Sequence, residues 1–149
     1  MTATGHCYCG KVRWELDPSC PVFAAYCHCE SCRRSHAAPM YWVAYVAAKE
    51  VTIHGKEWTK SPSLPTPHPV EGFARWFCTE CGTRTFITQT FPREVGPLAA
   101  GPVIGVFPAT FDSIPSSFQP QMHIFCSEAV LDLTQLDDGL LKHATFPSE

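Results

Sequence analysis

The chain has 149 residues, a formal net charge of −3, 14 prolines and nine cysteines. This length suffices for one domain with a buried core, and no apolar run reaches the roughly 18 residues that a membrane-spanning helix needs. The acidic balance and the lack of a basic block count against nucleic acid as a partner.

Cysteine usage suggests a cytoplasmic, metal-binding protein. Residues Met1–His6 contain no basic segment followed by an apolar one, so they do not resemble a signal peptide. Thiols stay reduced in the cytosol, where many cysteines favour metal binding over disulfides. The frequent prolines and glycines divide the chain into short pieces and disfavour long helices.

Short strands are expected along most of the chain. Alternating or β-branched and aromatic runs predict them at residues 11–16, 22–26, 40–46, 51–54, 73–77, 83–90 and 103–107. Residues 123–125 and 129–133 are expected to be late strands or extended segments. Residues 33–38 predict one or two helical turns, ended by Pro39. The proline-rich stretches Ser61–Gly72 and Phe91–Pro102 are expected to be irregular loops. We therefore predict a mainly β single domain over residues 1–149, with short antiparallel sheets braced by metal and at most brief helices.

Four cysteines form two pairs that suit one closed metal site. Cys7 and Cys9 make a C-x-C pair followed by Gly10, and Cys78 and Cys81 make a C-x-x-C pair at the expected tip of a hairpin. Four thiolates from two such turns are the usual ligands of tetrahedral structural zinc. We expect this metal to tie the N-terminal strand to the central hairpin and to contribute to folding.

A second cluster has the pattern C-x-C-x-x-C, formed by Cys27, Cys29 and Cys32. Three thiolates can hold one zinc ion and leave its fourth position open, which is typical of a reactive zinc site. The alternative is an ordinary closed site with a fourth ligand from elsewhere. The candidates for that ligand are Cys20, His28, His36, His68 and His123, although the strand pleat would point His28 away; Cys126 is expected to be a buried small side chain.

Taken together, these motifs closely resemble the glutathione-dependent formaldehyde-activating (GFA) family, whose domain is shared with centromere protein V. The resemblance runs in order along nearly the whole chain. The matching segments are Gly5–Glu15, Cys27–Arg34, Phe77–Thr83, His123–Ile124 and Leu136–Leu140.

The resemblance implies a β-tent-like fold with two zinc ions. The structural ion would be held by Cys7, Cys9, Cys78 and Cys81. The catalytic ion, which could be labile, would be held by Cys27, Cys29 and Cys32. The implied activity is that of a carbon–sulfur lyase, which joins glutathione to formaldehyde to give S-hydroxymethylglutathione.

One departure from the family pattern lies beside the second cluster. The family often has a glycine soon after the arginine pair, and this chain has Ala37 there, with His36 before it. We expect this replacement to alter the turn.

A site of three thiolates suits a thiol substrate better than a carbonyl, because its negative charge makes zinc a weaker Lewis acid. We expect the thiol to ionise there and to attack formaldehyde or another small carbonyl, or to leave in the reverse reaction. Arg33 and Arg34 could pair with a carboxylate of a glutathione-like substrate, or form a solvated surface. The rival interpretations are a non-catalytic zinc- or thiol-binding module and a protein-interaction domain.

Overall fold

The computed structural model describes residues 1–62, 72–95 and 97–147. It divides into two compact units. The first unit is made of Met1–Phe23 and Ala44–Phe118, and the second is made of Ala24–Val43 and Gln119–Glu149. That residues 1–149 form one domain stays a prediction.

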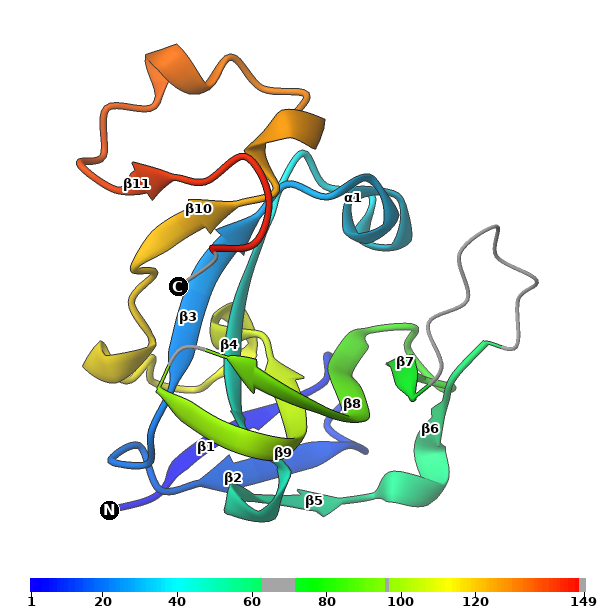
Figure 1. Cartoon of the computed structure of the whole chain (residues 1–149). Coiled ribbons are helices and arrows are strands. Elements are labelled where there is room, and N and C mark those ends of the chain that lie inside the picture. The colour runs from blue at the N-terminus through cyan, green and yellow to red at the C-terminus, as the bar shows by residue number, and fades with distance from the viewer. Residues whose placement is uncertain (63–71, 96, 148–149) are drawn as a thin grey trace. The chain divides into compact units, whose positions relative to one another are not determined.

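Strands dominate the described residues (Figure 1). The strands are β1 (Ala3–His6), β2 (Arg13–Leu16), β3 (Phe23–Cys27), β4 (Tyr41–Ala47), β5 (Val51–His54), β6 (Thr59–Lys60), β7 (Phe73–Cys78), β8 (Arg84–Val95), β9 (Leu98–Val106), β10 (Met122–Ile124) and β11 (Leu141–Lys142). The α-helix α1 spans Glu30–His36, and short 3₁₀ helices span Ala48–Glu50, Lys56–Trp58, Pro108–Thr110, Ser116–Phe118, Cys126–Glu128 and Leu133–Gln135. The predicted mainly β fold with brief helices is confirmed.

The first unit contains a small antiparallel sheet in the order β1-β2-β5. Its middle strand shows the period-two pattern expected from the sequence, because Trp14 and Leu16 are buried while Arg13 is exposed. Val12, just before the strand, is also fully buried. The apolar face of β2 therefore contributes to the core of this unit and fixes the direction in which the chain leaves the first cysteine pair.

The same unit contains the antiparallel series β6-β7-β8-β9, with the end of β4 paired to β9. The predicted hairpin is confirmed: β7 and β8 pair, and the C-x-x-C turn lies at its tip. The irregular loop predicted at Phe91–Pro102 is wrong, because β8 continues to Val95 and β9 already begins at Leu98. Register shifts on either side of Arg93 interrupt the ladder, and such bulges let a proline-containing strand stay paired. The loop predicted at Ser61–Gly72 falls mostly on residues 63–71, which lie outside the described residues.

In the second unit β10 lies between β3 and β11 and pairs in parallel with both. The register places His123 opposite Tyr26 and Ile124 opposite Cys27. These parallel pairings are absent from the predicted pattern of antiparallel sheets. They bring the second half of the chain alongside the start of the second cysteine cluster.

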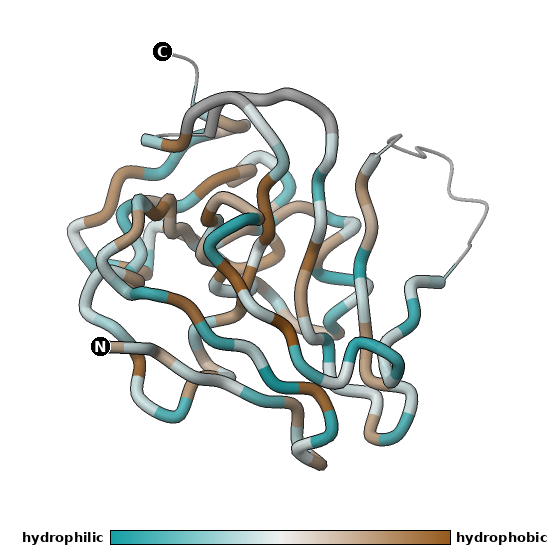
Figure 2. Tube along the Cα trace, turned by 90° about the horizontal axis from the view of Figure 1, so that it is seen from below, coloured by the Kyte–Doolittle hydropathy of each residue, from teal (hydrophilic) through white to brown (hydrophobic). Residues whose placement is uncertain are grey.

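Hydropathy changes over short distances along the trace, as expected for strands with one buried face (Figure 2). No helix in the described ranges is both long and apolar enough to cross a membrane.

The helix α1 ends in a left-handed residue. Ala37 has φ 51° and ψ 43°, and its backbone N–H caps the helix by bonding to the Arg33 carbonyl. This conformation costs an L-amino acid about 1–2 kcal/mol, whereas glycine adopts it freely. The departure noted in the sequence, alanine in place of a glycine, therefore falls on a position where glycine is physically favoured.

We predict that Ala37→Gly stabilises the protein by about 0.5–1 kcal/mol, because relief of the left-handed strain exceeds the extra flexibility of the unfolded chain. Ala37 is exposed, so little packing is lost with its methyl group. Thermal unfolding should show a midpoint about 2 °C higher. The matched control Ala38→Gly, at a position without positive φ, should lower the midpoint; an equal effect of both variants would contradict the explanation.

Candidate metal centres

The first cluster is built from two tight turns of similar design. In one, the Cys7 N–H bonds to the Val12 carbonyl at 3.0 Å and the Gly10 N–H bonds back to the Cys7 carbonyl at 3.0 Å. In the other, the Cys78 N–H bonds to the Thr83 carbonyl at 2.9 Å and the Gly82 N–H bonds back to the Cys78 carbonyl at 2.8 Å.

Both glycines that close these turns have positive φ, 79° at Gly10 and 77° at Gly82. Glycine is the residue that adopts this conformation without strain, so the sequence itself specifies the turns that orient the thiols.

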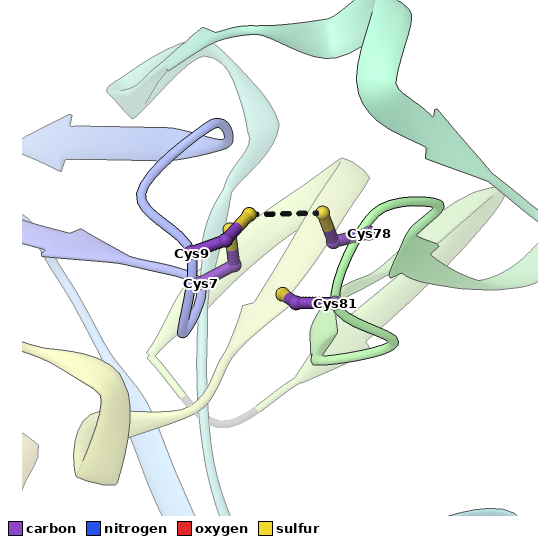
Figure 3. Close-up of side chains that lie close together, drawn as sticks. All are labelled: Cys7, Cys9, Cys78 and Cys81. Carbon is purple, nitrogen blue, oxygen red and sulfur yellow. Dashed lines mark hydrogen bonds between the residues drawn. The ribbon is translucent and has the colours of Figure 1, made fainter.

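The four thiols of these turns converge on one point (Figure 3). Their sulfur atoms all lie within 4.8 Å of one another, with Cys7 and Cys9 at 3.5 Å and Cys9 and Cys78 at 3.8 Å. Cys7 and Cys78 are fully buried, whereas Cys9 is exposed and Cys81 is half-buried. Four soft donors at this spacing fit a tetrahedral metal ion.

Polar contacts tie the two turns to each other. The Tyr8 N–H donates to the Thr83 hydroxyl at 3.1 Å, and Lys11 forms an ion pair with Glu80 at 3.1 Å. The same ammonium group lies 3.9 Å from the ring centre of Trp58. These groups are partly exposed, so each interaction contributes on the order of 1 kcal/mol or less to stability. Together they orient the two turns, and a metal ion bound by the four thiols would hold the turns together more tightly.

Crowding among these thiols shifts their ionisation in opposite directions. The Lys11 backbone N–H favours the Cys9 thiolate, but desolvation and the adjacent thiols raise the pKa of Cys9 to about 12. Burial opposes ionisation of Cys81, but hydrogen bonds, chiefly from Thr83, lower the pKa of Cys81 to about 6. One thiol of the set is thus poised to ionise, and a divalent cation at the centre would favour ionisation of the others.

The second cluster lies where β3 passes into α1. Cys27 ends the strand, Cys29 is the residue before the helix, and Cys32 lies in the first turn of the helix. The three sulfurs lie within 4.8 Å of one another, and no fourth cysteine, histidine or acidic ligand of the described chain joins the group. Cys27 and Cys32 are 3 % and 4 % exposed, so these ligands are shielded from water, and Cys29 is half-buried.

Ionising this cluster requires a compensating positive charge. Hydrogen bonds with Cys29 and Cys32, together with burial, raise the pKa of Cys27 well above its usual range. Cys32 also donates through its sulfur to the Tyr41 hydroxyl at 3.3 Å. Crowding and burial therefore favour the protonated form of Cys27, and a divalent cation bound between the three sulfurs would favour its thiolate instead.

None of the candidate fourth ligands within the described residues belongs to the second cluster. His28 and His123 are fully buried and bond to each other at 2.8 Å between Nε2 and Nδ1, while His36 stacks on Tyr41. Cys20 and Cys126 lie outside both thiol groups, and His68 is outside the described residues. Cys126 is half-buried, so the expectation of a buried side chain was too strong.

The two arginines beside the cluster have partners on their own segment. The Arg33 Nε donates to the His28 carbonyl at 3.2 Å, and the Arg34 Nε pairs with Glu30 at 3.0 Å on the exposed side of α1. Arg33 thus braces the backbone between two of the thiols. Neither the sequence spacing nor the charge pattern indicated that role.

Sequence reasoning also missed a polar chain that ends at His28. His123 bonds to His28 on one side and, through Nε2, to Asp138 at 2.7 Å on the other. The signal in the sequence was that all three residues fall in segments that match the resemblance noted above.

A comparison with protein-family models matches residues 2–128 to the glutathione-dependent formaldehyde-activating enzyme (GFA) family. The chain belongs to this family. A search of curated proteins finds no match. The GFA assignment confirms the resemblance seen in the cysteine motifs, and both cysteine clusters lie inside the matched range. Asp138 lies beyond it.

We predict that Cys78→Ser removes one metal ion per chain and lowers the free energy of unfolding by roughly 4 kcal/mol or more, because metal binding there contributes directly to folding. Cys27→Ser should remove the other ion with a smaller loss of stability, since its ligands are close in sequence. Elemental analysis and denaturant unfolding measure both effects. The control Cys20→Ser, outside both clusters, should keep two ions; an unchanged metal content in Cys78→Ser would contradict the assignment.

Proposed function

We propose that this GFA-family chain is a zinc-dependent carbon–sulfur lyase that uses a thiol such as glutathione and a small carbonyl such as formaldehyde. The observation that carries the proposal is the cluster of Cys27, Cys29 and Cys32, which groups three thiols without a fourth ligand from the described residues. A closed structural site has four protein ligands, as the other cluster does. A site with three is suited to receiving a ligand from solution.

The proposed reaction is the addition of a thiol to a carbonyl, and it needs no reactant besides these two. The substrate sulfur forms a bond to the carbonyl carbon, and the thiol proton ends on the former carbonyl oxygen; the reverse reaction breaks the same bond. Zinc at this site would supply a position at which the substrate thiol ionises near neutral pH. Because the protein contributes three negatively charged ligands, the site favours a thiol over a carbonyl oxygen as the bound atom.

The residues of the chain hold and shield the site. Burial of Cys27 and Cys32 excludes water from two of the ligands, and the contact with Tyr41 fixes the position of the Cys32 sulfur. Arg34, exposed beside the cluster, is the better placed of the two arginines to meet a substrate carboxylate, because Arg33 already bonds to the His28 carbonyl.

A non-catalytic thiol- or metal-binding module is the second candidate. The internal partners of Arg33 and Arg34 favour it, since a cation engaged within its own helix segment is less available to a substrate. That the partner is a small thiol and not a nucleic acid stays a prediction.

We predict that the native protein accelerates exchange between free glutathione and its formaldehyde adduct above the spontaneous rate. Exchange NMR at equilibrium measures this rate directly. Cys27→Ser should reduce it to the background, because the cluster then lacks a ligand, whereas Cys20→Ser should match the native protein. A native protein that binds glutathione but leaves the exchange rate at background would establish the non-catalytic module instead.

We predict that Arg34→Ala raises the apparent KM for glutathione severalfold with little change in kcat, as expected for a contact that binds substrate and transition state equally. Its pair with Glu30 complicates a single substitution. Glu30→Gln is the matched control, because it removes the pair and keeps the cation. Equal KM values in all three proteins would exclude the carboxylate contact.

A further inference from the structure

A chain of three polar side chains runs from the surface of the second unit to the second cluster. The Asp138 carboxylate bonds to Nε2 of His123 at 2.7 Å, and Nδ1 of His123 bonds to Nε2 of His28 at 2.8 Å. Both imidazoles are fully buried, and their rings stack with centres 5.1 Å apart. His28 lies between the ligands Cys27 and Cys29, so the chain ends inside the cluster's own loop.

The order of donors and acceptors along this chain is fixed from its outer end. Hydrogen bonds to His123 and to the Leu140 backbone N–H lower the pKa of Asp138 to about 2, so its carboxylate only accepts. His123 then donates from Nε2, and the neutral tautomer with this proton has a bare Nδ1 that accepts from Nε2–H of His28.

The inner end of the chain is consistent with this order. Nδ1 of His28 is buried and has no hydrogen-bond partner in the described part of the chain. The same tautomer leaves that atom bare, which avoids an unpaired buried N–H.

The backbone around His28 is tethered as well. Its N–H donates to the Ile124 carbonyl at 3.0 Å, and its own carbonyl accepts from Arg33 at 3.2 Å. His123 is held in turn by its carbonyl, which accepts from the His143 N–H at 2.9 Å. The residue between the two thiols is therefore fixed at its N–H, its side chain and its carbonyl.

Packing alone does not account for this arrangement. An apolar side chain would fill the same buried volume without the desolvation cost of two imidazoles, and buried polar networks are favourable only where their partners are well oriented. What the network adds is a defined direction for each ring, as outer-shell hydrogen bonds do around metal ligands.

We propose that Asp138, His123 and His28 form a positioning relay that sets the geometry of the Cys27–Cys29 loop and thereby the metal affinity of the second cluster. Asp138 selects the tautomer of His123, His123 selects that of His28, and His28 holds the loop so that the thiols on either side converge. All three are positioning residues, and none needs to touch substrate. The inference rests on the proposed function only in taking the cluster as a metal site.

The first test reads the tautomers. In two-bond ¹H–¹⁵N correlation spectra of the native protein, His28 and His123 should both appear protonated on Nε2. Asp138→Asn, which keeps the size but removes the charge, should shift both rings toward mixed tautomers. The matched control Asp137→Asn, at the adjacent exposed position, should leave the spectrum native. Native tautomers in Asp138→Asn, or an Nδ1-protonated His28 in the native protein, would overturn the relay.

The second test reads the metal. Zinc is titrated away with a chromophoric chelator, and the step missing in Cys27→Ser identifies the second cluster. Asp138→Asn should bind zinc there about tenfold more weakly, in keeping with the loss of outer-shell partners elsewhere, while the other step stays native. Changed tautomers with unchanged zinc affinity would show that the network does not control the cluster and would overturn the proposal.

The two proposals fail in different ways. If glutathione exchange stays at the spontaneous rate while both relay tests succeed, the lyase activity is wrong and the relay is correct. If exchange is accelerated and Asp138→Asn changes neither tautomers nor zinc affinity, the relay is wrong and the activity stands.

Discussion

The convergence of thiols from distant parts of the sequence is the constraint on which the first unit depends. The sulfurs of Cys9 and Cys78 approach to 3.8 Å although 69 positions separate them. Closing a chain of this length costs entropy that grows slowly with length, and a metal bound only by the closed form offsets that cost. The second cluster has almost no such entropy cost, because Cys27 and Cys32 lie within one strand–helix junction. A bound metal would therefore contribute differently to folding at the two sites.

The sequence predicted the cysteine turns better than the contacts around them, because the turns are local and the contacts are not. The spacings C-x-C and C-x-x-C, each followed by a glycine, specify local turns, and local turns follow from local residues. The extension of β8 to Val95 did not follow, because prolines normally end a strand and bulges here accommodate them. The contact of His123 with His28 depends on the parallel register of β10 on β3, which brings together segments 95 positions apart. No periodicity within either segment encodes that register.

The two arginines have internal partners that their position in the motif did not indicate, and their role in binding substrate stays a prediction. The pair follows the third thiol directly, which favours a role in binding substrate. Arg33 instead donates to a backbone carbonyl of the loop it follows, and this bond shortens the reach of its guanidinium. Such a contact keeps the loop carbonyl satisfied at a buried site, where an unpaired oxygen would cost on the order of 1–3 kcal/mol. Support of the loop and the proposed binding of substrate would therefore compete for the Arg33 side chain.

The polarity of the relay suits a site in which three thiolates around a divalent ion would carry a net negative charge. A carboxylate placed directly against the thiols would raise their pKa and weaken their hold on a metal, because like charges disfavour ionisation. Two imidazoles separate Asp138 from the cluster loop instead, and burial, with His123 and Arg33 nearby, lowers the pKa of His28 and favours its neutral form. The orientation imposed by the carboxylate thus reaches the loop through hydrogen bonds, while its charge stays at the far end of the relay. A carboxylate in direct contact with the thiols could not orient the loop without also placing its negative charge beside them.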